Sequence, residues 1–123
     1  MAESFERWIP LRRLSLSDLP KYGACPAVYA LRDASDGDTL KYGCAGSLRS
    51  RIVGNFLAGF GGNGPTSTTQ RLHAQLFDKG MIERVEIAWI ETQDRDEAER
   101  KETEFRAAYT AAHGRRPVWD LRD

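Results

Sequence analysis

The sequence predicts an α+β domain in which a small, mostly antiparallel three-stranded sheet is flanked by helices. The first observation is a β-branched and aromatic run at 27–31, followed by turn residues and a second run at 39–43, which is typical of a hairpin. The second is the alternation of apolar and polar side chains at 82–92, which indicates a third strand. Helical spacing of apolar residues occurs in 47–59, 69–79 and 94–113.

The predicted order is strand, strand, helix, helix, strand, helix. We divide the chain into a domain at 22–123 and a short extension at 1–21 that is expected to pack on it. Ser47 suits the N-cap of the first helix, because its hydroxyl can accept a backbone hydrogen bond. Gly80 and Gly114 follow the second and third helices, where glycine commonly ends a helix.

Length and composition indicate a single domain that does not span a membrane. The chain has 123 residues, of which 41% are hydrophobic and 29% charged, and no apolar run approaches the roughly 20 residues that a membrane span needs. The N-terminus is acidic and polar, whereas a signal peptide is basic and then apolar, so we expect a cytoplasmic location. Cys25 and Cys44 match no zinc pattern and are expected to be reduced thiols at one end of the hairpin.

The charges are unevenly distributed along the chain. The formal net charge is zero, yet 39–77 contains no Asp or Glu and four basic residues, so the remainder of the chain is net negative. A segment with few charges can simply be buried. However, this one includes a Gly-rich and hydroxyl-rich stretch at 59–69 that is too polar for a core, which favours a basic surface suited to phosphate.

Glu102 occupies an unexpected position on the last predicted helix. The residues Ala98, Glu102, Phe105, Tyr109 and Ala112 recur at spacings of four, three, four and three, which places them on one side of a helix. A carboxylate on an apolar stripe is costly unless it meets a cation or a metal. Glu102 is therefore either one half of a buried ion pair with an arginine or a functional carboxylate.

Arg51 is the second candidate. It follows Leu48 by three positions on the first predicted helix, so it borders the buried stripe, whereas Arg49 points further away. An arginine at such a place can present its planar guanidinium to a phosphate oxygen and stabilise charge in a phosphoryl transition state.

These residues, taken together, resemble the motifs of the GIY-YIG nuclease superfamily. The similar segments are Pro26-Ala27-Val28-Tyr29, Lys41-Tyr42-Gly43, Leu48, Arg51, Glu97-Ala98 with Glu102, and Pro117-Val118-Trp119-Asp120. Leu48 and Arg51 fall five and eight residues after Gly43, as in the family. The resemblance covers about residues 22–120 and implies a GIY-YIG-like nuclease domain.

The resemblance implies hydrolysis of phosphodiesters in DNA with one divalent metal ion, Mg²⁺ or Mn²⁺. Tyr29 matches the tyrosine that activates or orients the attacking water, Arg51 would hold the scissile phosphate, and Glu102 would bind the metal near the leaving oxygen. Such a metal acts as a Lewis acid and a charge clamp.

The second motif departs from the family, because Lys41 stands where the motif has a tyrosine. A lysine in a desolvated, cationic pocket can lose its proton and act as a base, or it can bind phosphate. Alternatively, Tyr42 takes the vacant place through a one-residue slip, which would reverse the face that it shares with Tyr29. Asp120 replaces the closing asparagine, and with Lys41 it motivates a different hypothesis: a catalytically silent module that binds nucleic acid or protein.

Further polar side chains are expected to contact the substrate. The predicted substrate-binding residues are Arg49, Asn55, Thr68, Thr69, Arg71 and His73. Thr68, Thr69 and Arg71 could grip a backbone phosphate at a helix N-terminus, while Asn55 equally suits an exposed helix position. DNA is favoured over RNA as the partner, and a homodimer or a targeting partner is a further source of specificity.

Overall fold

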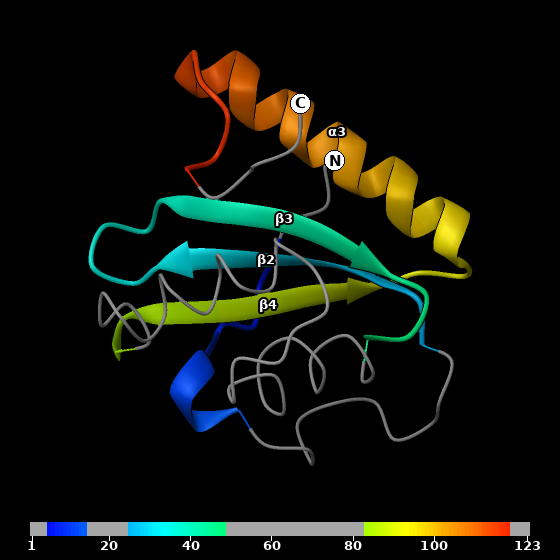
Figure 1. The fold of residues 1–123 in the computed structure, drawn as a ribbon, viewed down its shortest axis with the longest axis horizontal. Helices are drawn as coiled ribbons and strands as arrows, with labels where there is room; N and C mark the ends of the chain where they lie inside the picture. The colour runs from blue at the N-terminus through cyan, green and yellow to red at the C-terminus, as the bar shows by residue number, and fades with distance from the viewer. Residues whose placement is uncertain (1–4, 15–24, 49–82, 119–123) are drawn as a thin grey trace, which may run out of the picture.

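The computed structural model describes residues 5–14, 25–48 and 83–118 (Figure 1). They form one antiparallel sheet with strand order β1-β4-β2-β3, and one long helix, α3. The elements are β1 (Ile9–Pro10), a 3-10 turn (Leu11–Arg13), β2 (Ala27–Asp33), β3 (Thr39–Ala45), β4 (Val85–Glu91) and α3 (Arg95–His113). The predicted helices at 47–59 and 69–79 lie outside the described residues.

The α+β class and the antiparallel sheet are confirmed, but the predicted count of three strands is wrong. The fourth strand is β1, which pairs with β4 through Ile9 and Ile87. It has only two residues and includes Pro10, which lacks a backbone N–H and is therefore tolerated at a sheet edge. Part of the predicted N-terminal extension thus contributes directly to the sheet.

The hairpin of β2 and β3 is closed by a loop that Asp33 organises. The Asp33 carboxylate accepts hydrogen bonds from the backbone N–H and the hydroxyl of Ser35, and it forms an ion pair with Arg84 at 3.0 Å. The hydrogen bond from Ser35, followed by the charge of Arg84, holds the pKa of Asp33 below its usual value. Gly37 has a φ of 74°, which favours glycine.

The pairing of β2 with β3 contains one irregularity. Leu31 pairs with Lys41 but Arg32 pairs with Thr39, so Leu40 is an extra residue in β3. Beyond this bulge the pairing is regular, and Tyr29 faces Gly43. The side chains of β3 therefore alternate between two faces from Lys41 onwards.

Each face of the sheet has its own apolar core. The Tyr29 face is buried by a cluster with fully buried Leu31, Leu48 and Ile87. The opposite face, here called the α3 face, carries Ala30 and Tyr42 packed against Tyr109. Because both faces are covered, a one-residue change of register would move every buried side chain to the wrong side.

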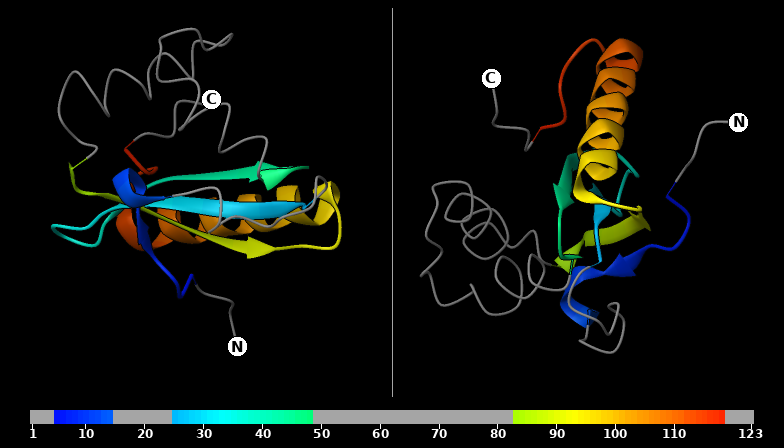
Figure 2. Two further views of the ribbon diagram at one scale, coloured as in Figure 1. Left: turned by 90° about the horizontal axis from the view of Figure 1, so that it is seen from below. Right: turned by 90° about the vertical axis from the view of Figure 1, so that its right-hand side faces the viewer.

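Helix α3 begins and ends as predicted. The Asp94 side chain accepts a hydrogen bond from the backbone N–H of Glu97, and the Glu97 side chain accepts one from the backbone of Gln93. Gly114 follows the helix with a φ of 71°. The helix packs along β3 and contacts β2, so it covers one face of the sheet (Figure 2).

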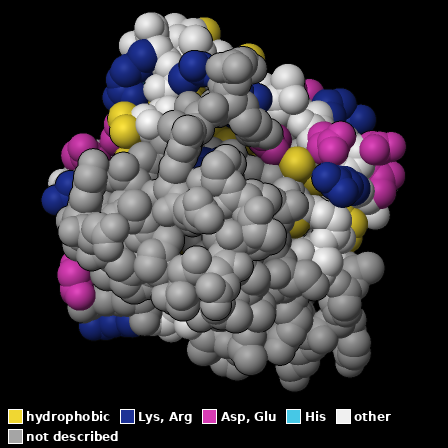
Figure 3. Space-filling view, viewed as in Figure 1, with side chains coloured by type: hydrophobic (Ala, Val, Ile, Leu, Met, Phe, Trp, Pro, Cys, Tyr) yellow, Lys and Arg dark blue, Asp and Glu magenta, His cyan; other side chains and the backbone are white. Residues whose placement is uncertain are grey.

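The outer side of α3 carries charges of both signs, seen interspersed over its N-terminal part (Figure 3). Arg95 pairs with Glu99 at 3.4 Å and Arg100 with Glu97 at 3.6 Å. Exposed pairs of this kind contribute little to stability. No helix in the described part of the chain has the length and apolar character to cross a membrane.

Candidate active site

Tyr29 is held across the neighbouring edge strand. Tyr29 is 2% exposed, and it pairs with Gly43 of β3. A Cβ atom placed on Gly43 would overlap the end of the Tyr29 ring, at Cζ and the hydroxyl oxygen. The end of the phenol ring therefore lies over the backbone of β3 at Gly43. This close approach is the physical reason for a glycine at 43.

Lys41 shares the Tyr29 face. It pairs with Leu31, two residues beyond Tyr29 along β2, and it is 7% exposed. Tyr42 pairs with Ala30 and faces α3, where its ring stacks on Phe105 with centroids 5.5 Å apart. The one-residue slip that would bring Tyr42 beside Tyr29 is therefore wrong, because the bulge at Leu40 precedes Lys41 and leaves the later register intact.

Glu102 is buried, as its place on the apolar stripe predicts. It is 3% exposed, with Ala98 and Tyr109 as the other buried residues of α3. Its carboxylate accepts a hydrogen bond from the thiol of Cys44, which faces α3 from β3. The alternative partner, Arg51, lies outside the described residues, so the ion-pair hypothesis stays open.

Both cysteines are free thiols. Each has a carboxylate neighbour. Cys44 lies beside Glu102, and Cys25 donates a hydrogen bond to Glu91 at a distance of 3.1 Å. Burial, followed by Glu91, raises the pKa of Cys25 to about 11. Burial, followed by the hydrogen bond and charge of Glu102, raises the pKa of Cys44 to about 12. The thiols therefore stay protonated at neutral pH.

The raised pKa values of the thiols predict a stability change at high pH. An unfolded thiol loses its proton near pH 9, whereas Cys44 in the folded chain keeps it to about 12. The native state thus binds more protons than the unfolded state in this range, so the free energy of unfolding falls as the pH rises from about 9. Chemical denaturation across this range should show the fall, and Cys44→Ser should reduce it. An unchanged pH dependence in Cys44→Ser would contradict the assignment.

Tyr29 and Glu102 approach consecutive residues of the edge strand from opposite sides. The Tyr29 ring covers Gly43, and Glu102 contacts Cys44. Among the described strands β3 is the last of the sheet, so a single strand separates the two side chains.

Several predicted site residues lie outside the part of the chain that the structure describes. They are Arg49, Arg51, Asn55, Thr68, Thr69, Arg71, His73 and Asp120. Their contacts with Tyr29, Lys41 and Glu102 remain predictions. Among residues 5–14, 25–48 and 83–118, there is no group of three or more His, Cys, Asp or Glu side chains that could hold a metal ion. Glu102 is the candidate ligand that its burial and position single out.

Two features of the site were not predicted from the sequence. One is the partner of each motif residue: Gly43 for Tyr29, and Cys44 for Glu102. For Cys44 a signal was available: Tyr42 and Cys44 are two residues apart in a strand, so they share a face and both point toward α3. The other is a polar cluster in which Asp38 accepts hydrogen bonds from Tyr109 and Arg115. No sequence pattern joins these residues.

Comparison with known proteins adds no relative. No protein-family model matches the chain, and no curated protein matches it at a significant level. The motifs in the sequence and the geometry around β3 are therefore the basis for a functional proposal.

Proposed function

We propose that this chain is a nuclease, and specifically a divalent-metal-dependent endonuclease of the GIY-YIG type that hydrolyses phosphodiester bonds in DNA. The observation that carries the proposal is the approach of Tyr29 and Glu102 to consecutive residues of the edge strand, Gly43 and Cys44. A tyrosine hydroxyl and a carboxylate at one strand edge are the two groups that the resemblance requires. We also propose that the protein acts on DNA in the cytoplasm.

The proposed chemistry assigns separate roles to the two faces. Tyr29 orients the attacking water through its hydroxyl, and Lys41, on the same face, donates to a phosphate oxygen. Arg51, on the helix that the sequence predicts at 47–59, would hold the scissile phosphate. These groups supply positioning and charge stabilisation, which account for most of the catalysis of phosphoryl transfer.

Glu102 suits one hard divalent cation. Mg²⁺ commonly takes one or two carboxylates from a protein and completes its coordination with water and phosphate oxygens. The Glu102 carboxylate lies beside the thiol of Cys44 in the described part of the chain. When bound, the metal would supply Lewis-acid stabilisation of the leaving oxygen.

A catalytically silent module is the second candidate, and a specific contact favours it. A carboxylate that is 3% exposed and hydrogen-bonded to a thiol can serve packing alone. Such a module would bind nucleic acid or a protein partner on the same fold. It would keep Glu102 for the stability of the α3 face and would need no metal.

The two candidates differ in one assay. The purified protein is incubated with plasmid DNA, single-stranded DNA and structured RNA, with and without Mg²⁺, beside an Arg51→Ala variant. The nuclease proposal expects Mg²⁺-dependent cleavage of DNA, reduced about a hundredfold or more in Arg51→Ala. Binding without cleavage of any substrate would favour the silent module, and cleavage of RNA alone would favour an RNA-directed nuclease.

A further inference from the structure

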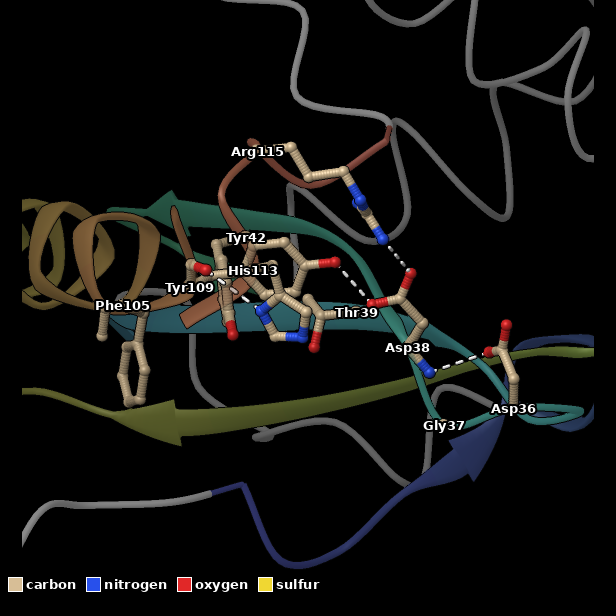
Figure 4. Close-up of a pocket in the computed structure, with 10 residues that line it drawn as sticks. Asp36, Gly37, Asp38, Thr39, Tyr42, Phe105, Tyr109, His113 and Arg115 are labelled. Atoms are coloured by element: carbon tan, nitrogen blue, oxygen red, sulfur yellow. Dashed lines mark hydrogen bonds and ion pairs between the residues drawn. The ribbon is translucent and has the colours of Figure 1, made fainter. Parts of the chain in front are cut away.

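A pocket of about 610 Å³ lies between the loop end of the hairpin and the C-terminal half of α3 (Figure 4). It begins at Tyr42 and Phe105 and extends to Asp38 and Arg115. Its size is that of a small-molecule site. None of the roles proposed above uses it.

Aromatic rings form one wall of the pocket. The rings of Tyr42 and Phe105 are nearly parallel, with an interplanar angle of 18°. Tyr109 and His113 are stacked as well, with centroids 3.9 Å apart and an interplanar angle of 12°. The wall therefore offers apolar, aromatic contact to a flat, unsaturated ligand.

Next to this wall, the pocket offers hydrogen-bond acceptors. The Asp38 carboxylate accepts one hydrogen bond from the Tyr109 hydroxyl and one from Arg115, the latter at 3.0 Å. These contacts, that of Tyr109 first, hold the pKa of Asp38 below its usual value, so the group accepts hydrogen bonds at neutral pH. Each oxygen keeps a second lone pair for a ligand. The hydroxyl of Thr39 also lines this side.

We infer that this pocket binds an unpaired nucleobase, with guanine as the best match. The base would lie against the aromatic wall, and its adjacent N–H donors would meet the Asp38 carboxylate. A cationic ligand is less suited, because Arg115 already occupies the carboxylate and lies 5.6 Å from the Tyr109 ring centre.

The inference rests on the proposed function, because it makes the pocket part of the substrate-binding groove. Tyr109 follows Glu102 by seven residues, which is about 10 Å along a helix. This distance is short enough for a nucleic-acid strand whose scissile phosphate lies at Glu102 to reach the pocket. The preferred substrate would then contain an unpaired base near the cut.

Ala108 provides a test that leaves the core intact, since it is exposed yet lines the pocket. Guanosine 5′-monophosphate is titrated without metal into the full chain, and its binding is followed by amide NMR shifts. We expect saturable shifts at Thr39 and His113, and a loss of affinity of about tenfold in Ala108→Leu. The control, Ala107→Leu, places the same side chain on an exposed neighbouring position and should bind like the wild type.

The result that overturns the inference is the absence of saturable shifts at the pocket, or equal affinity in the two leucine variants. Stronger binding of N-acetylarginine amide than of the nucleotide would overturn it as well, in favour of a protein partner. Because the titration involves no cleavage, its outcome is independent of nuclease activity. Pocket binding in a protein that cuts nothing would support the nucleobase site and reject the nuclease proposal.

Discussion

A Glu102→Gln variant is expected to lose Mg²⁺-dependent cleavage by about a thousandfold, equivalent to about 4 kcal/mol of transition-state stabilisation. The amide has the shape of the carboxylate and can still accept a hydrogen bond from Cys44. It lacks the negative charge that a hard cation requires. The loss should therefore appear in cleavage rates measured at saturating DNA, while the thermal unfolding midpoint changes little.

The matched control for this variant is Glu104→Gln. Glu104 belongs to the same helix, and its substitution is chemically the same. It is exposed, however, whereas Glu102 is buried. We expect Glu104→Gln to cleave within about twofold of the wild type, because isolated surface charges contribute little. Equal rates in the wild type and Glu102→Gln would reject the metal assignment.

A Gly43→Ala variant is expected to unfold more easily, by about 1–3 kcal/mol. The added methyl group would overlap the Tyr29 ring, which is buried in the core and cannot move without displacing its neighbours. The same displacement should lower the cleavage rate. Urea denaturation measures the first effect, and cleavage under conditions where the variant remains folded measures the second.

Two comparisons isolate the contact between Gly43 and Tyr29. At Gly46, three residues later, a new Cβ would lie 3.6 Å from the Arg95 side chain, which is ordinary contact. Gly46→Ala should therefore leave the stability nearly unchanged. In a Tyr29→Ala background, Gly43→Ala should also cost little. If it costs the same with and without the ring, the Tyr29 contact is not the reason for glycine at 43.

Local signals were sufficient to predict much of the fold. Helix α3 was recognisable because Asp94 and Gly114 mark its ends and its buried residues have helical spacing. The strands β2 and β4 were recognisable from their apolar runs. In contrast, β1 has two residues and depends on its pairing with β4, so no local pattern predicts it.

The site was predictable to the extent that helical spacing determines it. The burial of Glu102 follows from the spacing of α3, which does not depend on the rest of the fold. The faces of Lys41 and Tyr42 depend instead on the length of the loop and on the bulge at Leu40. A single extra residue in a strand exchanges the two faces, so the sequence left this choice open.

The most direct test of the proposal is the Mg²⁺ dependence of the DNA cleavage rate in a single turnover. We expect Tyr29→Phe to lower the maximum rate and to leave the Mg²⁺ concentration for half-maximal cleavage unchanged. Glu102→Asp should raise that concentration, because its shorter carboxylate holds the metal less well. No cleavage by the wild type at any Mg²⁺ concentration, or a wild-type metal requirement in Glu102→Asp, would contradict the proposal.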